Sequence, residues 1–269
     1  MGLLAWFRFE RAWAKALGKS AYFSRKTVAP GVTTIGGDYG PLFYRPQGSD
    51  LHTFWQVFKN REYDFSGVPQ HKTVDRAYEN ALVAGKTPVI IDAGANIGAA
   101  SVWFSTRFPK ARVIAIEPDP QNARICRMNA EGRNFEVVEA AIGAQAGSVS
   151  LLAEEDQGSW GIRTIPGGDI PVVTVPELVA RVPNAALLLV KVDIEGFESD
   201  LFSAGTDWLH QTTALFVEPH DWMLPGQGSS HSFRSAVGPE FDMLIAGENL
   251  LFIRNENQVA AVQQAADAA

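Results

Sequence analysis

The stretch Val89-Ile90-Ile91-Asp92-Ala93-Gly94-Ala95-Asn96-Ile97-Gly98 decides the fold. A short apolar run leads to an acid and a glycine-rich turn, and residues 99–108 then predict a helix. An apolar run of this length is typical of a parallel strand that is buried on both faces. The glycines allow a tight turn and the close approach of a ligand. We therefore expect a polar small molecule to lie above this turn.

The segments outward from this turn alternate between strand and helix. Alternating strands and helices imply right-handed crossovers and a mostly parallel sheet with helices on both faces. The predicted fold class is therefore α/β, with an N-terminal extension. Helices are predicted over residues 74–85, 121–130 and 176–181, and strands over residues 112–116, 135–138, 148–152, 186–192 and 214–217.

The chemistry of the turn indicates which ligand it holds. A dinucleotide site needs Gly-x-Gly-x-x-Gly and a pyrophosphate on the next helix, whereas this turn reads Asp-x-Gly-x-x-x-Gly. Asp92 would repel a pyrophosphate but would attract a sulfonium and an ammonium group. Glu117 ends the next predicted strand, where a carboxylate can accept hydrogen bonds from both ribose hydroxyls. We expect a nucleoside cofactor to be bound by Asp92, Gly94, Asn96, Gly98 and Glu117.

A second group of polar residues follows two later strands. Asp193 ends the apolar run 186–192, at the sheet edge where ligands bind in open α/β sheets, so we expect it to serve both cofactor and catalysis. Glu218 and His220 end the next strand. His220 is the leading candidate for a general base because an unperturbed histidine titrates at about 6.5. Asp193 would then orient the acceptor or the imidazole, with the two roles open to exchange.

We expect no metal ion at these residues, because the sequence lacks a tight metal-ligand spacing. Glu195 and Glu198 are three positions apart and are interpreted as caps of the following helix. Cation-assisted deprotonation remains the alternative to a metal-free base.

The acceptor side is predicted from aromatic and turn-rich segments. Residues 30–70 are rich in glycine, proline and aromatic residues and predict short strands or loops rather than a long helix. We expect residues 36–66 to fold over the acceptor as a lid that is separable from cofactor binding. The candidates for contact with the acceptor are Tyr39, His52, Trp160, Trp222 and His231.

Composition restricts the class of protein. The 269 residues fit one enlarged domain, and a formal net charge of −7 excludes the basic field that nucleic-acid binding requires. Cys126 is the single cysteine, so no internal disulfide or cysteine-based zinc site can form, and a reducing cytoplasm fits best. We expect residues 1–84 to form a helix and a lid, 85–257 the α/β domain, and 258–269 a frayed tail.

The first residues predict an amphipathic helix. Arg8, Glu10 and Arg11 interrupt the apolar opening before it reaches the length of a membrane span. Leu3, Leu4, Phe7, Trp13 and Leu17 share one face, and apolar helix faces are usually packing surfaces. We expect this helix to dock on its own domain or on a second copy of the chain as a homo-oligomer.

Four segments resemble the FkbM-type methyltransferases. The glycine turn 92–98 and the strand end Ala115-Ile-Glu-Pro-Asp119 are similar to the family's, and so is the loop Val217-Glu-Pro-His-Asp-Trp-Met-Leu-Pro-Gly226. The most specific match is Lys191-Val-Asp-Ile-Glu-Gly-Phe-Glu198, which is similar to Lys-Ile-Asp-Ile-Glu-Gly-x-Glu.

The resemblance covers roughly residues 85–255 and implies a Rossmann-like methyltransferase fold. It also implies S-adenosylmethionine as cofactor and transfer of a methyl group to a hydroxyl of a sugar, polyketide or related small molecule. The identity of the acceptor does not carry over, because one fold hosts many chemistries.

The residues alone leave two alternative functions open. A nicotinamide-dependent oxidoreductase would use the same sheet but would need the missing third glycine. A nucleoside-binding protein without catalysis would keep the fold and bind the cofactor without turnover.

Overall fold

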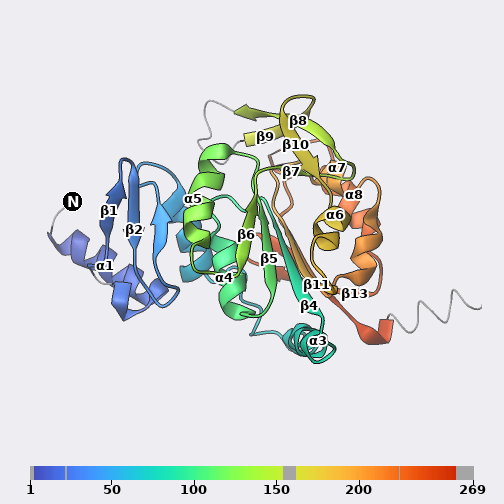
Figure 1. Cartoon of the computed structure of the whole chain (residues 1–269), viewed down its shortest axis with the longest axis horizontal. Helices are drawn as coiled ribbons and strands as arrows, with labels where there is room; N and C mark the ends of the chain where they lie inside the picture. The colour runs from blue at the N-terminus through green and yellow to red at the C-terminus, as the bar shows by residue number, and fades with distance from the viewer. Residues whose placement is uncertain (1–2, 22, 154–161, 224, 259–269) are drawn as a thin grey trace, which may run out of the picture.

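The centre of the molecule is a seven-stranded sheet of order β13-β14-β12-β11-β4-β5-β6 (Figure 1). The computed structural model describes residues 3–21, 23–153, 162–223 and 225–258. Five neighbouring strands run parallel, and β14 runs antiparallel to both of its neighbours. The strands are β4 (Thr87–Ala93), β5 (Arg112–Ile116), β6 (Phe135–Val138), β11 (Ala185–Val192), β12 (Ala214–Val217), β13 (Phe241–Ala246) and β14 (Asn249–Arg254).

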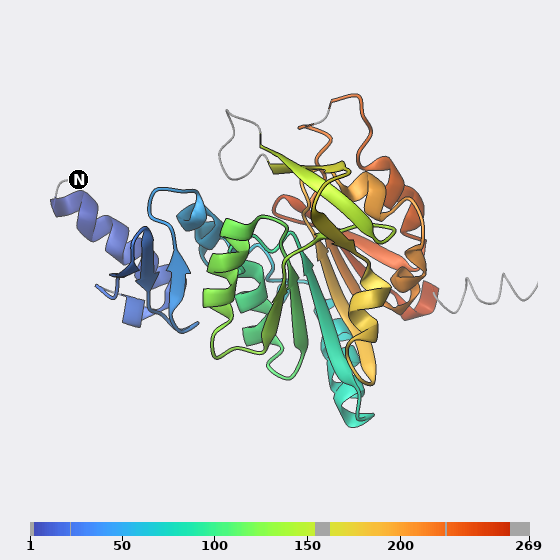
Figure 2. The same cartoon turned by 45° about the horizontal axis from the view of Figure 1, so that its top comes forward.

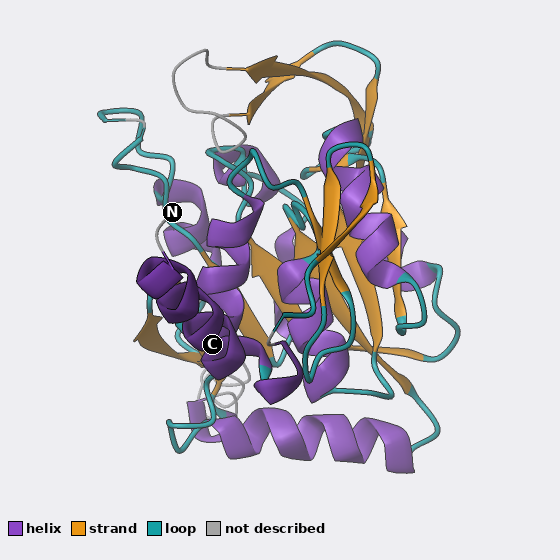
Figure 3. Ribbon diagram, turned by 90° about the vertical axis from the view of Figure 1, so that its left-hand side faces the viewer, coloured by secondary structure: helices purple, strands orange, loops and turns teal. Residues whose placement is uncertain are grey.

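Helices cover both faces of this sheet, as Figure 3 shows. Alternate residues of β4 pack on opposite faces: Ile90 lies in one core cluster, and Val89 and Ile91 lie in the other. This arrangement confirms the predicted α/β class with a mostly parallel sheet. One face is covered by α3 (His71–Val83), α4 (Ala99–Arg107) and α5 (Pro120–Ala130). The other is covered by α6 (Val175–Ala180), α7 (Glu198–Leu201), the 3₁₀ segment η4 (Thr206–Gln211) and α8 (His231–Ala236).

A small four-stranded sheet of order β7-β10-β8-β9 lies across the top of the molecule in Figure 2. The strand predicted over residues 148–152 therefore belongs to this separate sheet. Its strands are β7 (Ala141–Ile142), β8 (Gly147–Ala153), β9 (Ile162–Pro166) and β10 (Ile170–Val173).

The N-terminal extension packs against the α4 and α5 side of the sheet (Figure 1). It contains α1 (Leu3–Leu17), the 3₁₀ segment η1 (Lys19–Ala21), β1 (Lys26–Ala29), β2 (Val32–Ile35), β3 (Leu42–Tyr44), α2 (Asp50–Phe54) and the π-helical turn η2 (Trp55–Lys59). The prediction of short strands or loops over residues 30–70 fits β2 and β3 but is wrong for residues 50–59, which are helical because Phe54, Val57 and Phe58 share a buried face.

The extension shares its core with the sheet. Trp13 of α1 contacts Trp55 with ring centroids 5.5 Å apart, so this helix docks on its own chain. Tyr39 packs between Phe58 and Trp103, at 4.5 and 5.9 Å. Side chains from both parts belong to one buried cluster, so the described part of the extension is not a separately packed lid. No helix among the described residues is long and apolar enough to cross a membrane.

Candidate active site

Two adjoining cavities open at the carboxyl ends of β4, β5, β11 and β12. We name them the Glu117 cavity, of about 600 Å³, and the His220 cavity, of about 1010 Å³. The wall between the cavities consists of residues that line both: Gly94, Asn96, Asp193 and Glu195.

Glu117 is the central polar group of its cavity. Its side chain is buried, its Oε2 accepts a hydrogen bond from the Asn96 backbone N–H at 2.7 Å, and its Oε1 accepts one from Asp119 at 2.9 Å. Burial raises the pKa of Glu117 to about 7, against the opposing effect of these hydrogen bonds. The apolar walls are formed by Ile116, Pro118, Ala140, Ala141, Ile142, Ile194 and Phe197. This cavity can hold a diol at the carboxylate and a flat ring between apolar walls.

The glycines of the turn serve close backbone packing. Gly94 has a φ of +74°, and a Cβ on it would lie 1.7 Å from the carbonyl oxygen of Asp193. Gly98 has a φ of +83°, and its Cβ would lie 2.7 Å from Sγ of Cys126. Gly94 lines both cavities, whereas Gly98 faces α5 and lines neither. The interpretation that both glycines leave space for a ligand is therefore wrong for Gly98.

Asp92 lies beneath the turn rather than in a cavity. Its carboxylate is fully buried, accepts a hydrogen bond from Ser101 Oγ at 2.6 Å and lies 3.4 Å from Nζ of Lys191. The expectation that Asp92 faces the positive groups of a cofactor does not fit this position, because Lys191 already neutralises it. Lys191 also donates to the carbonyl of Gly94 at 2.7 Å and thereby connects β11 to the turn.

Lys191 and its partners form a buried charge network. Burial alone would lower the pKa of Lys191, but Asp193, Tyr63 and Asp92 outweigh burial and hold this pKa well above its ordinary value. Asp193 lies 3.2 Å from Nζ, so its carboxylate is paired with this buried cation. Lys191 belongs to the motif that resembles the family's but was not predicted as a site residue, although a charged residue within an apolar strand was a usable signal.

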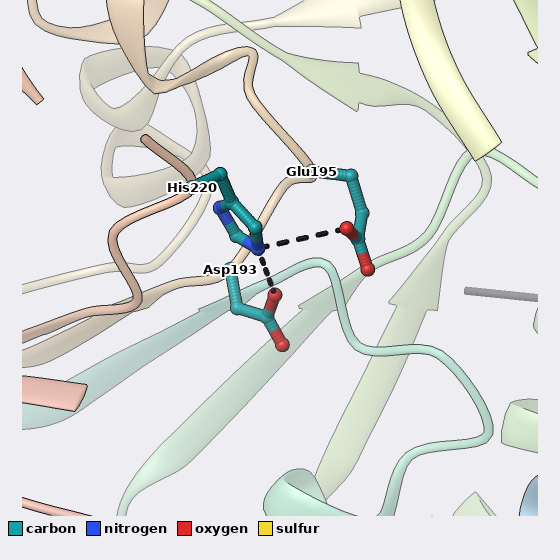
Figure 4. Close-up of side chains that lie close together, drawn as sticks. All are labelled: Asp193, Glu195 and His220. Carbon is teal, nitrogen blue, oxygen red and sulfur yellow. Dashed lines mark ion pairs between the residues drawn. The ribbon is translucent and has the colours of Figure 1, made fainter. Parts of the chain in front are cut away.

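His220 lies at the centre of a group of carboxyl groups, of which Figure 4 shows the nearest on the cavity side. Its Nδ1–H donates to Oε1 of Glu198 at 2.9 Å, and both side chains are buried. Its Nε2 lies 3.5 Å from Glu195, 3.6 Å from Asp193 and 3.8 Å from Glu218. The predicted trio of Asp193, Glu218 and His220 is thus brought together at the sheet edge.

The electrostatics of this group differ from the expectation for an isolated histidine. Burial lowers the pKa of His220, but the hydrogen bond and charge of Glu198, with Asp193 and Glu195, raise it to about 9. Burial and the charge of Asp193 raise the pKa of both Glu195 and Glu218 to about 8. The expectation that His220 titrates like an unperturbed histidine does not fit these surroundings, because neighbouring carboxylates stabilise its cationic form.

Glu195 and Glu198 do not act as a pair of helix caps. Glu195 has a φ of +53°, a conformation that costs a residue with a Cβ about 1–3 kcal/mol, and it lies in the wall between the cavities. Glu198 begins α7, and its Oε1 accepts hydrogen bonds from both His220 and the Ile194 backbone N–H. Strained residues held by their surroundings concentrate at functional sites.

The residues predicted to contact the acceptor separate into three groups. His52 and Trp222 line the His220 cavity. Tyr39 instead packs between the extension and Trp103 of α4, and His231 is exposed at the start of α8; neither residue lines a cavity. Trp160 lies outside the described residues.

The sequence lacks a tight metal-ligand spacing, but the structure still brings potential ligand atoms close together. They come from the ends of different strands, so a local spacing could not predict this. The ligand atoms of Asp193, Glu195 and His220 lie within 4.8 Å of one another. The same is true of Glu62, Glu218 and Glu248, of which the sequence analysis singled out Glu218 alone. Glu62 follows η2 and Glu248 lies between β13 and β14, so no local pattern joins them.

The sequence of this chain is similar to those of known proteins. The family model described as the methyltransferase FkbM domain matches residues 92–246, more than half of the chain. The 2-O-methyltransferase NoeI of Sinorhizobium fredii is 26% identical over 162 residues, which cover 52% of this chain and 67% of that protein. The hexuronic acid methyltransferase AglP of Haloferax volcanii is 26% identical over 187 residues, which cover 65% of this chain and 73% of that protein.

The matched region contains the strand ends that form both cavities, from Asp92 in β4 to Ala246 in β13. The match confirms the resemblance found in the sequence. It also sets aside the nicotinamide-dependent oxidoreductase and the protein without catalysis. The chain belongs to the family of FkbM-domain methyltransferases.

Proposed function

We propose that this protein transfers a methyl group from S-adenosylmethionine, bound in the Glu117 cavity, to a hydroxyl oxygen of a sugar-like acceptor in the His220 cavity. The family supplies the reaction type, and the two relatives, named as a 2-O-methyltransferase and a hexuronic acid methyltransferase, support transfer to an oxygen of a sugar-like acceptor. The observation that carries the proposal is the wall that both cavities share, because a transferred group must pass between two adjoining sites.

The residues of the Glu117 cavity fit this cofactor. The two carboxylate oxygens of Glu117, each already oriented by a backbone N–H, can accept hydrogen bonds from the ribose hydroxyls. The apolar walls fit the adenine ring, and Oδ1 of Asn96 is a buried atom without a partner among the described residues, so it can accept from an ammonium. S-adenosylmethionine, when bound, supplies an electrophilic methyl group on a sulfonium.

The chain must then hold the acceptor oxygen and accept its proton. We propose that the carboxylate of Glu195 accepts this proton. Glu195 lines both cavities, and its pKa of about 8 makes it a stronger base than an ordinary carboxylate. His220, cationic up to about pH 9, remains 3.5 Å from Glu195 and stabilises its charged form. Glu198 fixes the imidazole ring through Nδ1.

A pH–rate comparison tests this assignment. Rates of S-adenosylhomocysteine formation with a mixture of methyl hexosides are expected to rise through about pH 8 in the wild type, as Glu195 loses its proton. Glu195→Gln should lower the rate by about 100- to 10,000-fold and remove this rise, the range expected for loss of a general base. Affinity for S-adenosylhomocysteine, measured by calorimetry, should persist.

The matched variant His220→Gln separates the two candidate bases. Because the charge of His220 lowers the pKa of Glu195, its removal should move the rising limb to higher pH rather than remove it. If His220→Gln loses the limb and Glu195→Gln keeps it, the base is His220 and the assignment is wrong. Glu79→Gln, on the exposed side of α3, controls for a change of charge alone.

A further inference from the structure

The His220 cavity is strongly acidic. Its carboxyl groups come from five separate positions in the chain, namely Glu62, Asp193, Glu195, Glu218 and Glu248. The cationic groups among its described lining residues are Lys191 and His220, and both are engaged already. Lys191 lies against Asp92, Asp193 and the Gly94 carbonyl, and His220 lies against Glu198. Carboxyl groups therefore outnumber cationic side chains on this wall, and a bound cation would favour their ionised forms.

The excess is greatest at Glu62, Glu218 and Glu248, whose carboxylate oxygens lie within 4.8 Å of one another. The side-chain donors that reach them are neutral amides: Asn249 Nδ2 donates to Glu62 at 3.0 Å, and Gln56 Nε2 donates to Glu248 at 3.3 Å. Burial and the charge of Glu248 raise the pKa of Glu62. His220, 3.8 Å from Glu218, is shared with Asp193 and Glu195, and no ion pair joins Glu62 or Glu248 to a cationic side chain of the described residues, so this trio can accept a further cation.

An aromatic surface lies at the same cavity. Trp222 lines it and is 72% exposed, so its indole is accessible to a ligand. An indole face attracts cations and also packs against sugar rings. Carboxylates and an exposed indole together are the surroundings that stabilise an organic ammonium group.

We infer that the acceptor is an amino sugar or a similar amine-bearing polyol, whose protonated amine binds at Glu62, Glu218 and Glu248 while a neighbouring hydroxyl faces Glu195. This inference rests on the proposed function. An acceptor that carries a carboxylate is disfavoured, because its charge would enter a cavity lined by five carboxyl groups. The amine stays protonated beside three carboxylates, so it is not a nucleophile, and the methyl group goes to oxygen.

We also expect the binding of a cation to release protons from this cavity. Glu218, with a pKa of about 8, is partly protonated near pH 7.5, and an adjacent ammonium would lower that pKa. Asp193, Glu195, His220 and Lys191 face the same space and contribute to the total, so the released protons are measured for the cavity as a whole.

The test uses three matched ligands that differ only at carbon 6. Methyl 6-amino-6-deoxyglucoside, methyl glucoside and methyl glucuronide are titrated by calorimetry into the full chain saturated with S-adenosylhomocysteine. We expect affinity to decrease in that order, with a difference of about tenfold or more between the amine and the carboxylate. Repeating the titration in buffers of different ionisation enthalpy should reveal proton release for the amine alone.

The double variant Glu62→Gln and Glu248→Gln should remove this order of affinities, and Glu79→Gln should retain it. The inference is overturned if the glucuronide binds as tightly as the amine, or if no hexoside binds while S-adenosylhomocysteine still does. Tight binding of Mg²⁺ alone that is lost in the double variant would assign the carboxylates to a metal ion and also overturn it. Failure of S-adenosylhomocysteine to bind would instead contradict the proposed function.

Discussion

The carboxylate of Glu117 is held in a fixed orientation, but its burial makes the ionised form less favourable. Its oxygens are held by two backbone N–H groups, yet burial raises its pKa from 4.5 to about 7. The folded protein therefore binds more protons than the unfolded chain between these pH values. Stability contributed by this residue is present at low pH and decreases as pH rises from about 4.5 to 7.

Glu117→Gln should accordingly flatten the pH dependence of the melting temperature between pH 5 and 8 in the absence of ligand. The same variant should weaken binding of S-adenosylhomocysteine by about 1–3 kcal/mol, because it loses charge-assisted hydrogen bonds to the ribose. Thermal unfolding and calorimetry measure the two effects. An unchanged pH slope would show that Glu117 titrates normally, and unchanged affinity would show that the ribose does not contact it.

At the scale of elements, β3 reaches the cofactor side through Arg45, the residue that follows it. Arg45 binds Asp50 through its backbone N–H and its guanidinium, and its Nη2 donates to Oδ1 of Asn122 at 2.6 Å. Asn122 in turn donates to Glu117 at 3.4 Å. A residue of the extension thereby helps to position the carboxylate that we assign to the ribose.

Arg45→Ala should lower the free energy of unfolding by about 1–3 kcal/mol, since it leaves the buried carboxylate of Asp50 without its cation. It should also weaken S-adenosylhomocysteine binding by about 1 kcal/mol, because Asn122 loses a partner. Arg107→Ala serves as the control, because it removes an exposed ion pair between Arg107 of α4 and Asp75 of α3. Destabilisation without any change in affinity would limit Arg45 to a structural role.

The parallel strands could be predicted from sequence, and the edge strand β13 could not. β4, β5 and β12 are short apolar runs buried on both faces, which is a local signal. β13 lies at the edge, and its outward residues Met243 and Ile245 are apolar although 63% and 81% exposed. Their apolar character hides the alternation that would mark a half-buried strand.

The candidate site also contains some residues that could be predicted from sequence and others that could not. Asp193 and His220 could be predicted because both follow apolar strands, and parallel strands end at one edge. Glu62 and Glu248 could not, since the extension and a hairpin bring them there. The protonation of His220 also depends on burial and on four carboxyl groups, which sequence spacing does not encode.

At the scale of the whole molecule, the extension and the α/β sheet function as one unit. They share a buried cluster, and both line the His220 cavity, with His52 and Glu62 on one side and Asp193 and Glu218 on the other. We therefore propose that residues 50–63 form a fixed acceptor wall rather than a removable lid. The small sheet and the sequence after β6 complete the opposite side, around the Glu117 cavity.

The most direct measurement incubates the full chain with S-adenosylmethionine that carries a trideuteromethyl group and with the three methyl hexosides, and locates the label by fragment mass spectrometry. The account predicts one trideuteromethyl group on a hydroxyl oxygen, most in the amino hexoside, and a loss of label by about 100-fold or more in Glu195→Gln. Label on nitrogen, or no label on any hexoside in a protein that binds S-adenosylhomocysteine, would contradict it.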